Sequence, residues 1–118
     1  MLGVFHGRAL LHLGGEKGEK INVTAGDIIV IPAGVGHKNL KSENLRIVGA
    51  YPNGRDYDIK KGKEDERPQA EVNIATVPIP ERDPIQGKSG GVPQLWRDLR
   101  PLLIHKAQKN TLRKEGIL

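Results

Sequence analysis

The chain has 118 residues, a formal net charge of +5 at pH 7 and no cysteine. This length fits one small domain, and the lack of cysteine excludes disulfides, thiolate metal sites and cysteine nucleophiles. Only 36% of the residues are hydrophobic and few are aromatic, so a core has to be built mainly from Ile, Val and Leu, which suit strands. No apolar run approaches the roughly 20 residues of a membrane span, and the N-terminal residues do not resemble a signal peptide. We therefore expect a cytoplasmic protein without a membrane partner.

The positive charge is concentrated at the C-terminal end. Residues 97–118 carry a net charge of +4, whereas residues 1–96 carry only +1. No aromatic residue is interleaved with the basic residues of this tail, although stacking on bases needs such residues. The sequence therefore argues against nucleic acid as a partner, and binding through the tail stays a minor hypothesis.

Short strands and tight turns are predicted for the first 52 residues. Alternating apolar and polar residues predict strands that bury one face, Gly14–Gly18 predicts a hairpin loop, and Asp27 is expected to cap a turn after Gly26. Pro32 should end a buried strand, since proline cannot donate to a central ladder. The six expected strands are Leu2–Phe5, Arg8–Leu13, Lys20–Thr24, Ile28–Ile31, His37–Leu40 and Leu45–Tyr51. This pattern predicts an all-β sandwich or barrel.

The second half of the chain has a different character. Residues 55–97 are expected to form a charged, solvated loop and then an arm rich in Pro and Gly, with Val72–Val77 as an edge strand. Residues 98–118 form the basic tail, in which Pro101 is expected in the first turn of a helix from Leu102 to about Lys114. Residues 1–54 are thus predicted to be the β-barrel part of the molecule.

Residues 26–37 hold turn-forming residues and a histidine at fixed spacing. Gly26 permits a tight entry turn, Pro32 ends the apolar strand, and Gly34 allows a backbone conformation that side chains disfavour. The return places His37 at the start of the next strand, and we expect its imidazole to point into the barrel. A rigid hairpin is a suitable mount for a metal ligand.

This spacing, with Gly26, Pro32, Gly34 and His37 all present, resembles the second motif of the cupin superfamily. The flanking residues 2–9, 48–52 and 95–96 resemble a group of small bacterial cupins called YjlB-like. The resemblance implies a jelly-roll β-barrel and, in full-length relatives, an Fe, Mn, Ni or Zn ion held by histidines and a glutamate. Cupins include dioxygenases, isomerases, decarboxylases and binding proteins.

This sequence departs from the cupin pattern at the first motif. In cupins the first motif supplies two histidines and a glutamate, and a glycine follows the glutamate after six intervening residues. Gly7 fits that glycine, which places the glutamate before Met1. We therefore expect an N-terminally truncated cupin in which His37 is the lone remaining motif ligand and no metal is bound. Its missing strands would leave sheet edges and an apolar face open, so a homodimer, coverage by the arm or low stability is expected.

Other polar residues are assigned smaller roles. Asn39 lies on the same strand face as His37, and both Asn39 and Tyr51 are expected to line the pocket, although each could simply satisfy a local contact. His6 and His12 are expected to make ordinary hydrogen bonds at or near the surface.

No complete catalytic constellation is present in the sequence. The favoured hypothesis is a catalytically silent cupin that binds a small molecule or a protein; the alternative is a metal-dependent oxygenase- or isomerase-like enzyme.

Overall fold

Four antiparallel strands build the first part of the chain: β1 Leu2–Leu13, β2 Glu19–Thr24, β3 Ile28–Ile29 and β4 His37–Gly49. The computed structural model describes residues 1–56, 59–61 and 63–102. The chain divides into two units, Met1–Tyr57 and Asp58–Leu118. The first unit is an open β-sheet followed by one short 3₁₀ helix, and the second contains the α-helix described below.

β1 pairs with each of the other three strands. β4 runs along the whole of one edge of β1, from the Leu2–Gly49 pair to the Leu13–His37 pair. The other edge is shared, because β2 pairs with residues 8–13 and β3 with residues 2–3. β1 is therefore the strand that holds the sheet together.

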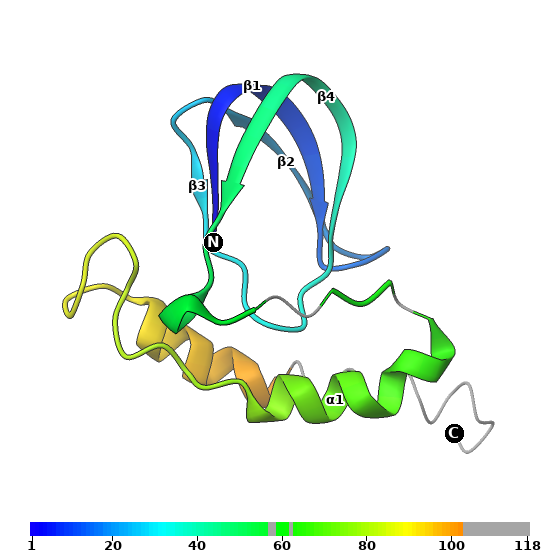
Figure 1. Ribbon diagram of the computed structural model, residues 1–118, viewed down its shortest axis with the longest axis vertical. Coiled ribbons are helices and arrows are strands. Elements are labelled where there is room, and N and C mark those ends of the chain that lie inside the picture. The colour runs from blue at the N-terminus through cyan, green and yellow to red at the C-terminus, as the bar shows by residue number, and fades with distance from the viewer. Residues whose placement is uncertain (57–58, 62, 103–118) are drawn as a thin grey trace. The chain divides into compact units, whose positions relative to one another are not determined.

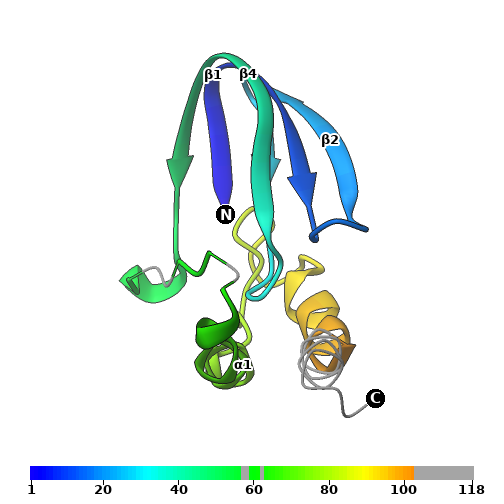
Figure 2. The ribbon, with the colours of Figure 1, turned by 90° about the vertical axis from the view of Figure 1, so that its right-hand side faces the viewer.

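The sheet bends sharply in the middle of β1 and β4 (Figures 1 and 2). Gly7 on β1 has a φ of 74°, and Asn44 on β4 has a φ of 49°. The pairing register shifts on both sides of His6, so the two strands carry bulges at the bend. A Cβ atom at residue 7 would collide with the carbonyl oxygens of Glu43 and Asn44. The close approach of the two backbones therefore requires glycine at this position.

The turn between β2 and β3 is fixed by backbone and side-chain hydrogen bonds. The Asp27 carboxylate accepts a hydrogen bond from the Thr24 amide at 2.8 Å, which confirms the capping role expected for Asp27. The Val4 carbonyl of β1 accepts a hydrogen bond from the Gly26 amide at 2.8 Å, and the Val4 amide donates to the Asp27 carbonyl at 2.9 Å. Gly26 takes a φ of 99° here, which favours glycine.

The core of the sheet unit is small and aliphatic. Alternate residues of β1 place Ala9 and Leu11 on one face, where Val23 of β2 joins them. The buried cluster is Val4, Ala9, Leu11 and Val23, and the half-buried side chains packed against it are Leu13, Ile21, Ile29 and Leu45. We call this side of the sheet the core face.

The strand count differs from the sequence prediction. Leu2–Phe5 and Arg8–Leu13 are one strand, because Gly7 bends the backbone and does not end it. His37–Leu40 and Leu45–Tyr51 likewise belong to a single strand, β4, with Asn44 at its bend. β3 is only two residues long. The all-β character of residues 1–52 is confirmed as a mainly antiparallel open sheet.

The edge strand predicted at Val72–Val77 is wrong, because these residues belong to helix α1, Arg67–Thr76, and its C-cap. Pro68 lies in the first turn, where its fixed φ suits a helix and its missing N–H costs no hydrogen bond. Val77 leaves the helix in an extended conformation, as expected for a residue that precedes proline. α1 is preceded by the short 3₁₀ helix η2, Glu64–Glu66, and the 3₁₀ helix η1 spans Pro52–Gly54.

The predicted arm rich in Pro and Gly, in the later part of residues 55–97, is more structured than expected. Asp83 and Gly87 exchange two backbone hydrogen bonds of 2.9 Å, and residues 92–102 are helical. Pro101 lies near the end of this described helical stretch and not at the start of a helix. The remainder of the predicted C-terminal helix falls outside the described residues. None of the helices in the described part of the chain is long and apolar enough to cross a membrane.

Gly7→Ala tests whether the bend depends on glycine. We expect a loss of unfolding free energy of about 1–3 kcal/mol from the positive φ, and a larger loss if the collision with β4 cannot relax. Gly15→Ala is the matched control, since its φ of 79° is similar but no atom lies within 4 Å of the added Cβ. Urea unfolding followed by circular dichroism measures both; equal losses would contradict the role of the close approach.

Asp83→Asn tests the loop before the second helical stretch. The Asp83 carboxylate accepts hydrogen bonds from the amides of Gln86, Ile85 and Val92, which lower its pKa below the ordinary 3.8. A lowered folded-state pKa means that the carboxylate stabilises the loop above pH 3.8 and that this contribution is lost as the pH falls through the folded-state pKa.

The measurement is hydrogen exchange of the Ile85 and Gln86 amides over a pH series. We expect Asp83→Asn to weaken their protection near neutral pH and to have little further effect in acid. Asp56→Asn, at an exposed position in the other unit, is the control. Unchanged protection in Asp83→Asn at neutral pH would contradict the assignment.

Candidate functional site

His37 is the first residue of β4 and lies opposite Leu13 of β1. Directly opposed residues of an antiparallel pair share one face of the sheet, so His37 lies at the end of the core face. The turn before it is tied to the β1–β2 loop by a 2.8 Å hydrogen bond from the Gly14 amide to the Gly36 carbonyl. The sequence predicts an enclosed imidazole, whereas His37 is exposed in the structure, because the described strands form an open sheet.

The turn that delivers His37 has the conformation expected from its residues. The Val35 amide donates to the Pro32 carbonyl at 3.2 Å, and Gly34 has a φ of 89°. β3 ends at Ile29 and its Ile28 is 53% exposed, so the prediction that Pro32 ends a buried strand is wrong. The three motif positions Gly26, Pro32 and Gly34 therefore all lie in turns.

Asn39 and Tyr51 are placed differently with respect to His37. Asn39 lies opposite Leu11, on the core face, and its side-chain amide donates to the Ser42 hydroxyl at 3.1 Å. Tyr51 follows the far end of β4, is 48% exposed and precedes η1. The structure thus brings Asn39 and His37 to one face and one end of the sheet, and Tyr51 lies beyond the opposite end of the same strand.

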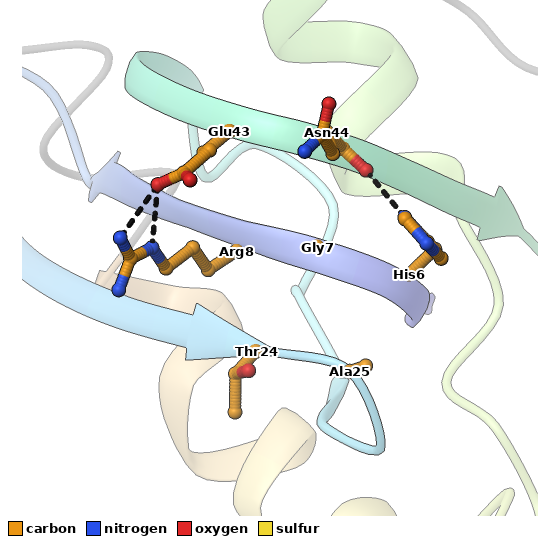
Figure 3. Close-up of a pocket in the computed structure, with 7 residues that line it drawn as sticks. All are labelled: His6, Gly7, Arg8, Thr24, Ala25, Glu43 and Asn44. Carbon is orange, nitrogen blue, oxygen red and sulfur yellow. Dashed lines mark hydrogen bonds and ion pairs between the residues drawn. The ribbon is translucent and has the colours of Figure 1, made fainter.

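A second polar arrangement lies at the bend of the sheet, where a hollow of about 330 Å³ opens (Figure 3). Its lining comes from β1, β4 and the end of β2, and consists of His6, Gly7, Arg8, Thr24, Ala25, Glu43 and Asn44. The hollow lies at the bulges, where the pairing register between β1 and β4 shifts.

The hollow is edged by polar contacts between β1 and β4. His6 Nδ1 donates to the Asn44 carbonyl at 2.8 Å, which confirms an ordinary hydrogen bond for this histidine. The Arg8 guanidinium donates from Nε and Nη2 to one oxygen of Glu43, at 2.9 and 2.6 Å. Both side chains of this ion pair are well exposed, at 72% and 62%.

Sequence reasoning did not find this hollow. The residues of its β4 wall fall in the gap that the prediction left between two separate strands. The available signal was Asn44 within that gap, because Asn tolerates positive φ and often marks a bend. The chemistry of the hollow is that of an open polar surface: it offers an imidazole, a guanidinium and amide groups as donors, and one carboxylate.

The described residues include no group of three or more His, Cys, Asp or Glu side chains arranged to hold a metal ion. Catalytic zinc sites commonly use three protein ligands and an open position. His37 is therefore a single candidate donor, and its role as a ligand stays a prediction.

Comparison with known proteins gives one informative match. The chain is 46% identical over 89 residues to the uncharacterized protein YjlB of Bacillus subtilis (strain 168), a match that covers 75% of this chain and 54% of the relative. The chain thus spans about half the length of the curated relative that it matches. No protein-family model matches the chain, and no solved structure matches it.

A double-mutant cycle on Arg8 and Glu43 tests whether their ion pair supports the bend. Exposed pairs contribute little, so we expect a coupling energy of about 0.2–1 kcal/mol between Arg8→Ala and Glu43→Ala, decreasing with added salt. Chemical unfolding of the four proteins measures it. A coupling well above this range, insensitive to salt, would show that the pair is a structural clamp.

Proposed function

We propose that the sheet unit is part of a cupin-like jelly roll and that this chain acts as a small-molecule-binding module without catalytic activity of its own. The observation that supports this proposal most is the register of β4. It puts His37 opposite Leu13 and Asn39 opposite Leu11. An imidazole and a side-chain amide therefore lie at one end of an apolar face. Ligand sites in proteins commonly combine apolar walls with a few polar groups.

The proposal separates this chain from its full-length relatives. One imidazole does not make a transition-metal centre, since about three protein ligands are usual. We propose that full-length relatives complete the site with further ligands and hold Fe, Mn, Ni or Zn, and that His37 marks the position of one ligand. The Bacillus subtilis relative is about twice as long as the matched region, and the further ligands are proposed to lie in its unmatched residues.

The alternative is a metal-dependent oxygenase- or isomerase-like enzyme. The motif of Gly26, Pro32, Gly34 and His37 favours it, because these residues mount an imidazole on a short turn at the sheet end. In that case the metal would activate a small substrate or oxygen. The proposed homodimer is compatible with either function and stays a prediction.

Metal analysis separates the two proposals. The untagged chain is incubated in turn with Fe(II), Mn(II), Ni(II) and Zn(II), desalted, and analysed for bound metal. We expect metal far below one ion per chain and no difference between the wild type and His37→Ala, because a single imidazole holds a metal weakly. His6→Ala is the matched control, since it removes one imidazole at the bend.

Stoichiometric metal that is lost in His37→Ala and kept in His6→Ala would contradict the metal-free module and favour the metal-dependent alternative. The Bacillus subtilis relative, purified in full length, is the second sample. We expect stoichiometric metal in it, and its absence would contradict the proposed metal-binding role of the full-length proteins.

A further inference from the structure

The side of the sheet opposite the core face carries an uneven distribution of charge. We call it the outer face; on β1 it holds Arg8, Leu10 and His12, which alternate with the core residues. Two cross-strand neighbours flank each of these residues. The three resulting rows are Thr24–Arg8–Glu43, Asn22–Leu10–Lys41 and Lys20–His12–Lys38.

The last of these rows, Lys20–His12–Lys38, contains only basic side chains. Both lysines are exposed, and His12 is half-buried between them. Among the described residues, Arg8 has its ion pair with Glu43, whereas Lys20, Lys38 and Lys41 have none. The neighbouring Glu19 lies opposite Leu13 and therefore on the core face. The row thus combines three nitrogen-bearing side chains without a facing carboxylate on the paired strands.

The spacing of this row allows its side chains to converge. Adjacent strands lie about 4.8 Å apart, so the Cα atoms of Lys20 and Lys38 are roughly 10 Å apart on either side of His12. Two four-carbon side chains can span that distance from both sides and meet above the imidazole. An anion held above the imidazole would lie between the two ammonium groups and accept charge-assisted hydrogen bonds from both.

We propose that the Lys20–His12–Lys38 row binds a phosphate-bearing small molecule. A phosphoryl group carries nearly two negative charges and three strong acceptor oxygens, which match two ammonium groups and one imidazole. A carboxylate offers one charge and two oxygens and matches the row less well. Lys41, in the adjacent row, supplies a further cation for a second phosphate of a diphosphate. The site is independent of the core face and of the proposed function.

The test is isothermal titration calorimetry of the full chain at low salt with inorganic phosphate, pyrophosphate and a sugar phosphate. We expect one saturable site that prefers pyrophosphate to phosphate. Lys20→Gln/Lys38→Gln should weaken pyrophosphate binding by about tenfold or more, since it removes two charged donors. The matched control is Lys63→Gln/Lys88→Gln, which changes the net charge equally at exposed positions of the other unit.

Amide chemical shifts locate the site, because bound pyrophosphate should perturb His12, Lys20 and Lys38 more than the residues of the core face. Circular dichroism verifies that the variants fold, which the exposure of both lysines favours. An equal loss in the control pair, or unchanged binding in Lys20→Gln/Lys38→Gln, would overturn the proposal. Tighter binding of a single-stranded oligonucleotide than of pyrophosphate would also overturn it, in favour of a polymer as the partner.

Discussion

Backbone pairing along both edges of β1 is the constraint on which the rest of the sheet depends. β4 occupies one edge from Leu2 to Leu13, and β2 and β3 divide the other. Because side chains alternate along a strand, this register decides which residues share a face, and a shift of one residue would exchange the two faces. It places His37 and Leu13 together on the core face, and Lys20, His12 and Lys38 together on the outer face.

The bend at Gly7 and Asn44 is the second constraint, and it links folding to surface chemistry. Positive φ values at both residues let the two strands turn together without losing their pairing on either side. The hollow edged by His6 and the Arg8–Glu43 pair lies at the same irregularity. Bulges commonly occur where a sheet re-aims side chains. The hollow therefore coincides with the bend, whereas the register decides which residues lie opposite the two ends of β4.

The two faces of the sheet carry different chemistry. The core face combines aliphatic side chains with His37 and Asn39 at one end, which is the basis of the proposed small-molecule module. The outer face combines an unpaired basic row with the Arg8–Glu43 pair within the described residues, which is the basis of the proposed phosphate site. The relative with 46% identity is about twice as long as its matched part, so the complete cupin-like site is proposed for proteins of that length.

The sequence by itself determined the all-β character of residues 1–52, the hairpin at Gly14–Gly18 and the turn capped by Asp27, since each follows from alternation or local turn chemistry. Its residue spacing also singled out His37. Only the tertiary structure decided that the strands on both sides of Gly7 are continuous, that Val72–Thr76 is helical and that His12 lies between two lysines. The strand continuity and the position of His12 depend on which strands pair across the sheet. The helix at Val72–Thr76 depends on which of two allowed local conformations the chain adopts. Residue spacing along the sequence gives no information on either.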